Sequence, residues 1–99
     1  MRMMLTVSIP VEVGNTTVKN GRLPQIMQDT MARLKPEAAY FLAKDGKRTA
    51  LFFFDLADVS NIPSIVEPLF MGMDAAVAIV PVMNAEDLQK GLVEAAKNF

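Results

Sequence analysis

The pair Asp45-Gly46 stands between two runs rich in β-forming residues, EAAYFLAK and KRTALFFFDL. An Asp-Gly pair favours the positive φ angles of a type I′ turn, which joins two antiparallel strands through a two-residue loop. Such a loop places Lys44 opposite Lys47, and therefore Tyr40 opposite Leu51. The sequence thus predicts an antiparallel hairpin whose register is fixed by its turn.

Strict alternation along a strand assigns the hairpin side chains to two faces of a sheet. One face is predicted to carry Tyr40, Leu42, Leu51, Phe53 and Asp55. The other is predicted to carry Ala39, Phe41, Ala50, Phe52 and Phe54. Because both sets are largely apolar, neither face of this hairpin is suited to water.

The segment before the hairpin contains one predicted strand and one predicted helix. Apolar residues alternate over residues 3–13, which predicts a half-buried strand. A helical stripe of apolar residues follows over residues 24–35. Pro24 suits the first turn of this helix, and Pro36 ends it.

The segment after the hairpin repeats this arrangement in the opposite order. Apolar residues fall at helical spacing over residues 61–73, but Pro68 removes a backbone donor, so we expect a kink or an early stop near Glu67. Residues 74–83 are rich in valine and isoleucine and are predicted to form a strand, with Pro81 at a strand end or on a sheet edge.

Asn84 is the expected cap of a final amphipathic helix over residues 85–99. The order of elements is therefore βαββαβ with an extra C-terminal helix, in a single domain of residues 1–99. This order is typical of a ferredoxin-like α+β sandwich, in which two helices cover one face of a four-stranded antiparallel sheet.

The second face of such a sheet is left uncovered, and here it is predicted to be apolar. Its expected members are Met4, Leu42, Leu51, Phe53, Ala76, Ala78 and Val80. Apolar residues make up 52% of the chain, and no apolar run approaches the length of a membrane helix. We therefore expect a homodimer that buries two such faces against each other, and no membrane partner.

Charge and the N-terminal segment bear on partners and localisation. The 10 basic and 11 acidic residues are scattered and give a net charge of −1, so no nucleic-acid partner is expected. The start MRMMLTVSIP has no sustained apolar core and no small-residue cleavage site. We therefore expect a cytoplasmic protein.

Histidine and cysteine are both absent. The chain therefore has no imidazole for acid–base chemistry near pH 7, no thiolate nucleophile, and no His or Cys ligand for zinc, iron or haem. No acidic cluster has the spacing of a Ca²⁺ loop either. We expect no cofactor and no metal site.

The stretches GNTTVKNG, LKPEAAYF and EPLF, together with the predicted order of elements, resemble the dimeric α+β barrel superfamily, in a bacterial branch of unassigned function. The resemblance implies two ferredoxin-like subunits packed sheet against sheet. Characterised branches include cofactor-free monooxygenases, lactone isomerases, chlorite dismutases and haem-degrading enzymes. The haem branches depend on a histidine that this chain lacks, so the resemblance implies the fold and not those activities.

The stretch GNTTVKNG also invites comparison with a phosphate-binding loop. A Walker loop has glycine directly before its lysine, whereas Lys19 is flanked by Val18 and Asn20, and Gly21 comes later. We interpret the stretch as a loop or broken first turn in a long strand-to-helix connection. Long connections often line pockets, which makes Asn15 and Lys19 candidates for contacting a ligand carboxylate.

The run KRTALFFF stands where the RNA-recognition motif, which has the same order of elements, has its third strand. That module needs a glycine and two exposed aromatic rings on its third strand. Arg48 occupies the glycine position, and Thr49 and Leu51 occupy the ring positions. RNA binding is therefore not expected, and the phenylalanines are interpreted as core.

Polar side chains on the uncovered face form the candidate ligand site, namely Thr6, Ser8, Tyr40 and Asp55, with Phe53 beside them. In a catalytic interpretation Asp55 is the base and Tyr40 orients a substrate oxygen. In a structural interpretation Asp55 ends its strand or caps the next turn, and Tyr40 packs at the dimer interface. Arg48 is expected to pair with Asp55 or Glu37 on the surface.

Three classes of function remain open at this point. The leading hypothesis is a binder of a small, partly apolar molecule in a cleft of the sheet, between it and the helices. The alternatives are a cofactor-independent isomerase or monooxygenase using Asp55 and Tyr40, and a structural or regulatory dimer without a pocket. Whether the protein is an enzyme is not decided by these residues.

Overall fold

In the computed structural model, which describes residues 1–99, the predicted hairpin forms with the predicted register. β2 (Ala38–Lys44) and β3 (Lys47–Asp55) are antiparallel, and Lys44 pairs with Lys47 and Tyr40 with Leu51. Asp45 and Gly46 adopt φ angles of 54° and 74°, both in the left-handed region. The two-residue turn therefore sets the pairing as turn chemistry predicts.

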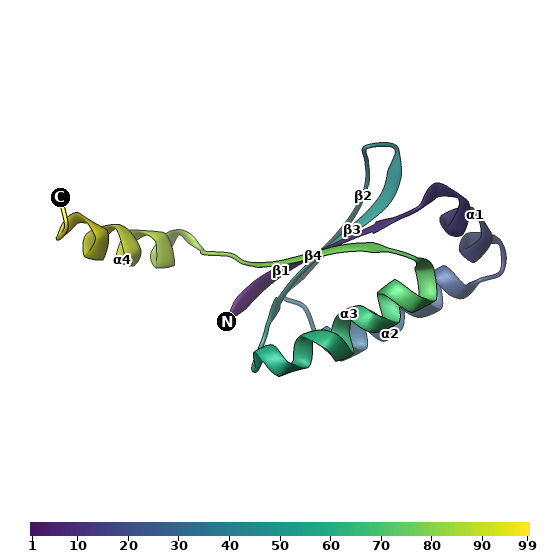
Figure 1. Cartoon of the computed structure of the whole chain (residues 1–99), viewed down its shortest axis with the longest axis horizontal. Coiled ribbons are helices and arrows are strands. Elements are labelled where there is room, and N and C mark those ends of the chain that lie inside the picture. Colours follow the sequence, from purple (N-terminus) through teal and green to yellow (C-terminus); the bar gives the residue numbers. More distant parts are fainter.

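Two further strands complete one antiparallel sheet. β1 (Arg2–Ile9) lies between β3 and β4 (Ala76–Pro81), so the strand order is β2-β3-β1-β4 (Figure 1). This order is consistent with a ferredoxin-like α+β fold. Pro81 ends β4, which is an edge strand, as predicted, because an edge tolerates a residue without a backbone donor.

The strand predicted over residues 3–13 exists but ends before residue 10, and the prediction of a loop after it was wrong. β1 ends at Ile9, and helix α1 runs from Val11 to Lys19 after Pro10. Proline cannot donate to a sheet ladder but is well suited to the start of a helix. Val11 and Val13 thus belong to α1, and the expected long connection is a helix instead.

Helix α2 (Arg22–Leu34) follows α1 after a tight turn at Asn20 and Gly21, where Gly21 has a φ of 78°. The predicted helix over residues 24–35 therefore exists, and its last residue is followed by Lys35 in a left-handed conformation before Pro36. The second glycine of GNTTVKNG is used for this turn, because a left-handed residue costs glycine little.

Helix α3 (Ile62–Met73) follows the short 3-10 helix η1 (Val59–Asn61) and continues through Pro68, so the expected early stop near Glu67 was wrong. Proline at position 68 deprives the carbonyl of Ser64 of its helical donor. Arg33 Nη1 from α2 donates to that carbonyl at 2.6 Å instead. The neighbouring helix thus satisfies the group that proline leaves free.

Arg33→Met is expected to lower the free energy of unfolding by about 1 kcal/mol, because it removes this hydrogen bond. In a Pro68→Ala background the amide of residue 68 can bond Ser64, so Arg33→Met should then cost much less. Urea unfolding of the four proteins measures the coupling. An equal cost of Arg33→Met in both backgrounds would contradict this account of Pro68.

The core lies between the sheet and helices α2 and α3, which cover one face of the sheet (Figure 1). Phe52, Leu5, Leu69, Met73 and Val7 are its largest fully buried side chains. Phe41 and Phe52 stack edge to face on this side, with ring centroids 5.9 Å apart. The hairpin face that carries Phe41, Phe52 and Phe54 is therefore the covered face, as predicted.

The opposite face of the sheet is covered by no element of the chain. The register places three cross-strand rows on it: Val80, Met4, Phe53 and Ala38; Ala78, Thr6, Leu51 and Tyr40; Ala76, Ser8, Thr49 and Leu42. We call these twelve residues the uncovered face. None of them is charged, and Tyr40, Leu42 and Val80 are among the exposed large apolar side chains.

Helix α4 (Ala85–Ala96) forms as predicted, with a capping box between Asn84 and Asp87. It does not return to the sheet, however, and projects from the end of β4 (Figure 1). The molecule measures 55 × 28 × 19 Å, and its radius of gyration of 16.0 Å exceeds the roughly 13 Å of a compact domain of 100 residues. None of its helices has both the length and the apolar character required to cross a membrane.

Candidate functional site

Four of the residues predicted for a ligand site do share the uncovered face. Thr6 and Tyr40 lie on either side of Leu51 in one row, and Ser8 and Phe53 lie in the flanking rows. The rings of Tyr40 and Phe53 meet edge to face with centroids 6.4 Å apart. These residues form a continuous surface with an apolar centre and hydroxyl groups around it.

Asp55 lies on the same side of the sheet but at its far end. It is four residues from Leu51, the partner of Tyr40, so the Cα atoms of Asp55 and Tyr40 are about 14 Å apart at ordinary strand spacing. Its carboxylate Oδ1 accepts from the Met1 ammonium at 2.7 Å, and its side chain is 80% exposed. The structure therefore brings Tyr40 to Phe53 and leaves Asp55 apart from both hydroxyl-bearing rows.

Arg2, and not Arg48, pairs with Glu37, which corrects the expected ion pair. Arg2 Nε donates to Glu37 Oε1 at 2.9 Å, and Arg2 Nη1 donates to Asp87 Oδ2 at 3.0 Å. These contacts raise the pKa of Arg2 above its usual value, chiefly through the hydrogen bond to Glu37. Arg48 makes no ion pair with any carboxylate of the chain.

Arg48 lies at the other end of the sheet, against helix α1. Its Nη1 donates to Asn15 Oδ1 at 3.2 Å. A Cβ added at the buried Gly14 would lie 2.6 Å from this nitrogen, so the first glycine of GNTTVKNG leaves room for the Arg48 side chain. Asn15 thus positions a guanidinium, which has five donors and uses one of them here.

A cavity of about 380 Å³ opens next to Arg48, between α2 and the hairpin. Its wall is formed by nine residues, and all but Arg48 and Thr49 are apolar: Ile9, Leu23, Met27, Phe41, Leu42, Ala43, Ala50, Thr49 and Arg48. The cavity exists because the hairpin extends past α2, so Phe41 is 57% exposed although it is on the covered side of the sheet.

Of the residues predicted for ligand binding, only Asn15 bears on this cavity, through its bond to Arg48. Lys19 is exposed at the end of α1 and does not line it. Sequence reasoning missed the cavity because alternation assigns Phe41 and Ala50 to a face but does not reveal where the helix layer ends. The available signal was β2, in which Phe41, Leu42 and Ala43 continue the apolar run to the residue before Lys44 at the turn.

The chain contains no group of histidine, cysteine or acidic side chains arranged to hold a metal ion. An apolar cavity with an arginine at its wall is suited to binding a molecule with an apolar body and an anionic end. Comparison with known proteins gives no match, whether to a family model, to a curated protein or to a solved structure.

Proposed function

We propose that this protein binds a small amphipathic anion, such as a short carboxylate, in the cavity beside Arg48. The observation that carries the proposal is a guanidinium without a carboxylate partner at the wall of an otherwise apolar cavity of about 380 Å³. Since a water molecule in the liquid has a share of about 30 Å³, the cavity holds roughly a dozen non-hydrogen atoms.

The apolar wall residues and Arg48 contribute to binding in different ways. Leu23, Met27 and Phe41 remove an apolar body from water, which contributes about 25 cal/mol per Å² of apolar surface buried. Methionine adapts its shape readily, so the site accommodates more than one hydrocarbon skeleton. Arg48 selects for the anion, because its planar donors match the two oxygens of a carboxylate.

The proposal includes a homodimer of the dimeric α+β barrel type, formed through the uncovered face. The strand order and the twelve uncharged residues on the face support it, because a monomer exposes such a surface to water at a cost. The isomerase or monooxygenase alternative needs Asp55 and Tyr40 at one reacting atom, and no contact between them supports that arrangement within one copy.

The test compares octanoate with octan-1-ol, which have the same hydrocarbon chain and differ in charge. We expect octanoate to bind more tightly, and both ligands to shift the amide resonances of residues lining the cavity. Arg48→Gln should raise the dissociation constant of octanoate about tenfold, which corresponds to a loss of about 1.4 kcal/mol of binding free energy. The affinity for octanol should stay nearly unchanged.

Gly14→Ala provides a second variant that keeps the arginine but displaces it. Alanine is the better helix former, so the thermal midpoint should stay equal or rise, whereas octanoate binding should weaken. Equal affinity for octanoate and octanol in the unmodified protein would overturn the anionic end of the proposal. Resonance shifts confined to residues outside the cavity would overturn the site itself.

A further inference from the structure

Helix α4 presents an apolar seam that nothing in its own chain covers. Ala85, Leu88, Leu92 and Ala95 follow one another at alternating spacings of three and four residues, which places them on one side of a helix. Leu88 is 47% exposed and Leu92 is 55% exposed, and no residue of α4 is buried. A helix of 12 residues is marginal in water by itself, so this seam requires a surface to pack on.

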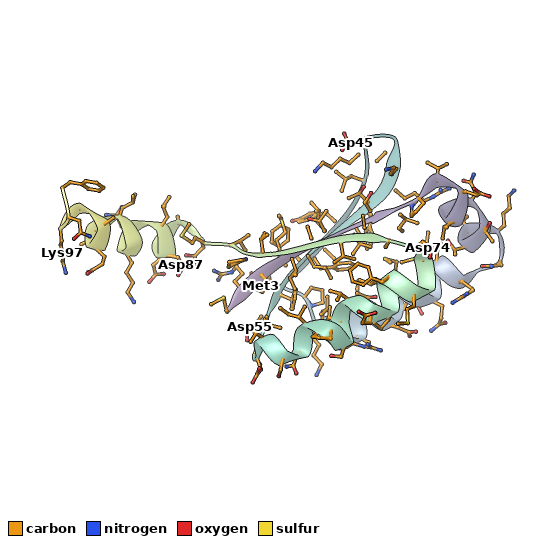
Figure 2. All side chains as sticks on the ribbon, viewed as in Figure 1. Met3, Asp45, Asp55, Asp74, Asp87 and Lys97 are labelled. Carbon is orange, nitrogen blue, oxygen red and sulfur yellow. The ribbon has the colours of Figure 1, made fainter.

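The first turn of α4 is tied to the end of the sheet, which directs the helix away from its own domain. Val82 N donates to Arg2 O at 3.1 Å, which extends the pairing of β4 with β1 by one residue. The Asp87 carboxylate accepts from the backbone N–H of Asn84, the N-cap residue, and also from Arg2 Nη1 at 3.0 Å. Figure 2 shows Asp87 at this junction.

Only Val82, Met83 and Asn84 connect β4 to α4, and this linker spans at most about 11 Å when extended. For α4 to lie on its own uncovered face, the chain would have to reverse within these residues and give up both contacts of Arg2. The seam of one copy therefore does not pack on the uncovered face of the same copy.

We propose that two copies exchange α4, so that the seam of each helix packs on the domain of the other copy. This inference rests on the homodimer of the proposed function. Two-fold symmetry doubles every such contact, because each copy gives its helix and receives one. A second copy thus covers the uncovered face with its own face and offers the seam a further surface beside it.

The area of the interface also favours the exchange. Four strands about 4.8 Å apart and three rows about 6.7 Å apart make the uncovered face a plane of roughly 19 by 20 Å. A stable dimer buries about 800 Å² of accessible surface on each partner. The area of this plane is about half of that value. Helix α4, about 18 Å long and 10 Å wide, adds nearly half of the area of the plane.

The test measures the dimer dissociation constant of the full-length protein by sedimentation over a concentration series. Leu88→Glu and Leu92→Glu should each raise this constant at least tenfold, because each places a carboxylate in the seam. Lys90→Glu places the same side chain on the opposite side of α4 and should leave the constant within twofold. At submicromolar concentration, where the copies are separate, circular dichroism should show the same domain stability in all three, since none of these residues is buried within one copy.

A second measurement identifies the surface that the seam contacts. In a mixture of ¹³C-labelled and unlabelled protein, isotope-filtered spectra should show contacts from the methyl groups of Leu88 and Leu92 to the other copy. A dimer that tolerates both glutamate variants and shows no such contacts would overturn the exchange while leaving the sheet interface in place. A full-length protein that stays monomeric would overturn both.

Discussion

Leu51→Glu is expected to convert the proposed dimer, of about twice 10.9 kDa, into a monomer at low micromolar concentration. Leu51 lies at the centre of the uncovered face, in the row between Thr6 and Tyr40. Dimerisation through this face would remove the new carboxylate from water with no cation near it, at a cost of several kcal/mol. The dissociation constant should therefore rise about a hundredfold or more.

Light scattering after size-exclusion chromatography measures this change directly. Gln28→Glu is the matched control, because Gln28 is exposed on α2, on the other side of the sheet. It adds the same charge and should leave the mass unchanged. If Leu51→Glu kept the mass of the unmodified dimer, the interface would have to lie elsewhere, and the uncovered face would lose its proposed partner.

The hairpin and the sheet were predictable because their determinants are local. Asp45 and Gly46 fix the turn, the turn fixes the register, and alternation then decides which side chains share a face. Another local rule, that proline has no backbone donor, placed Pro81 at a strand end or on a sheet edge. A register that is set by two residues does not depend on the rest of the fold, so these predictions did not require tertiary information.

The errors arose where tertiary contacts compensate for a local preference. Val11 and Val13 continue the alternation of β1, but α1 buries Gly14 and Thr17 against the domain, where Gly14 lies next to the Arg48 side chain of β3. Pro68 is tolerated in α3 because Arg33, 35 positions earlier in the chain, supplies the missing donor. Neither compensation is visible in the segment that it affects.

The candidate site was predictable only in part for a related reason. The sequence grouped Thr6, Ser8, Tyr40 and Phe53 on one face, and the structure agrees. It did not reveal the cavity beside Arg48, because a cavity depends on where one layer ends relative to another. Likewise, the pattern of α4 predicts that one side of the helix is buried but not which surface buries it.

Phe52 and Phe53 are neighbours in the sequence on opposite faces of β3, and their replacement by alanine should separate folding from association. Phe52 is fully buried, so Phe52→Ala is expected to lower the free energy of unfolding by about 3–5 kcal/mol. That loss is a large fraction of the roughly 5–15 kcal/mol that stabilises a typical domain. It should be the same at all protein concentrations, because the core lies within one copy.

Phe53 is only half-buried within one copy, where it contacts Tyr40, and the proposed partner covers the rest. Phe53→Ala should therefore cost little at submicromolar concentration and clearly more at tens of micromolar, where the proposed dimer would form, because association stabilises the folded state by mass action. Urea unfolding of both variants at these two concentrations distinguishes the faces. If the effect of Phe53→Ala on the free energy of unfolding did not depend on concentration, the uncovered face would not be buried by a second copy. An effect of Phe52→Ala below about 1 kcal/mol would contradict its place in the core.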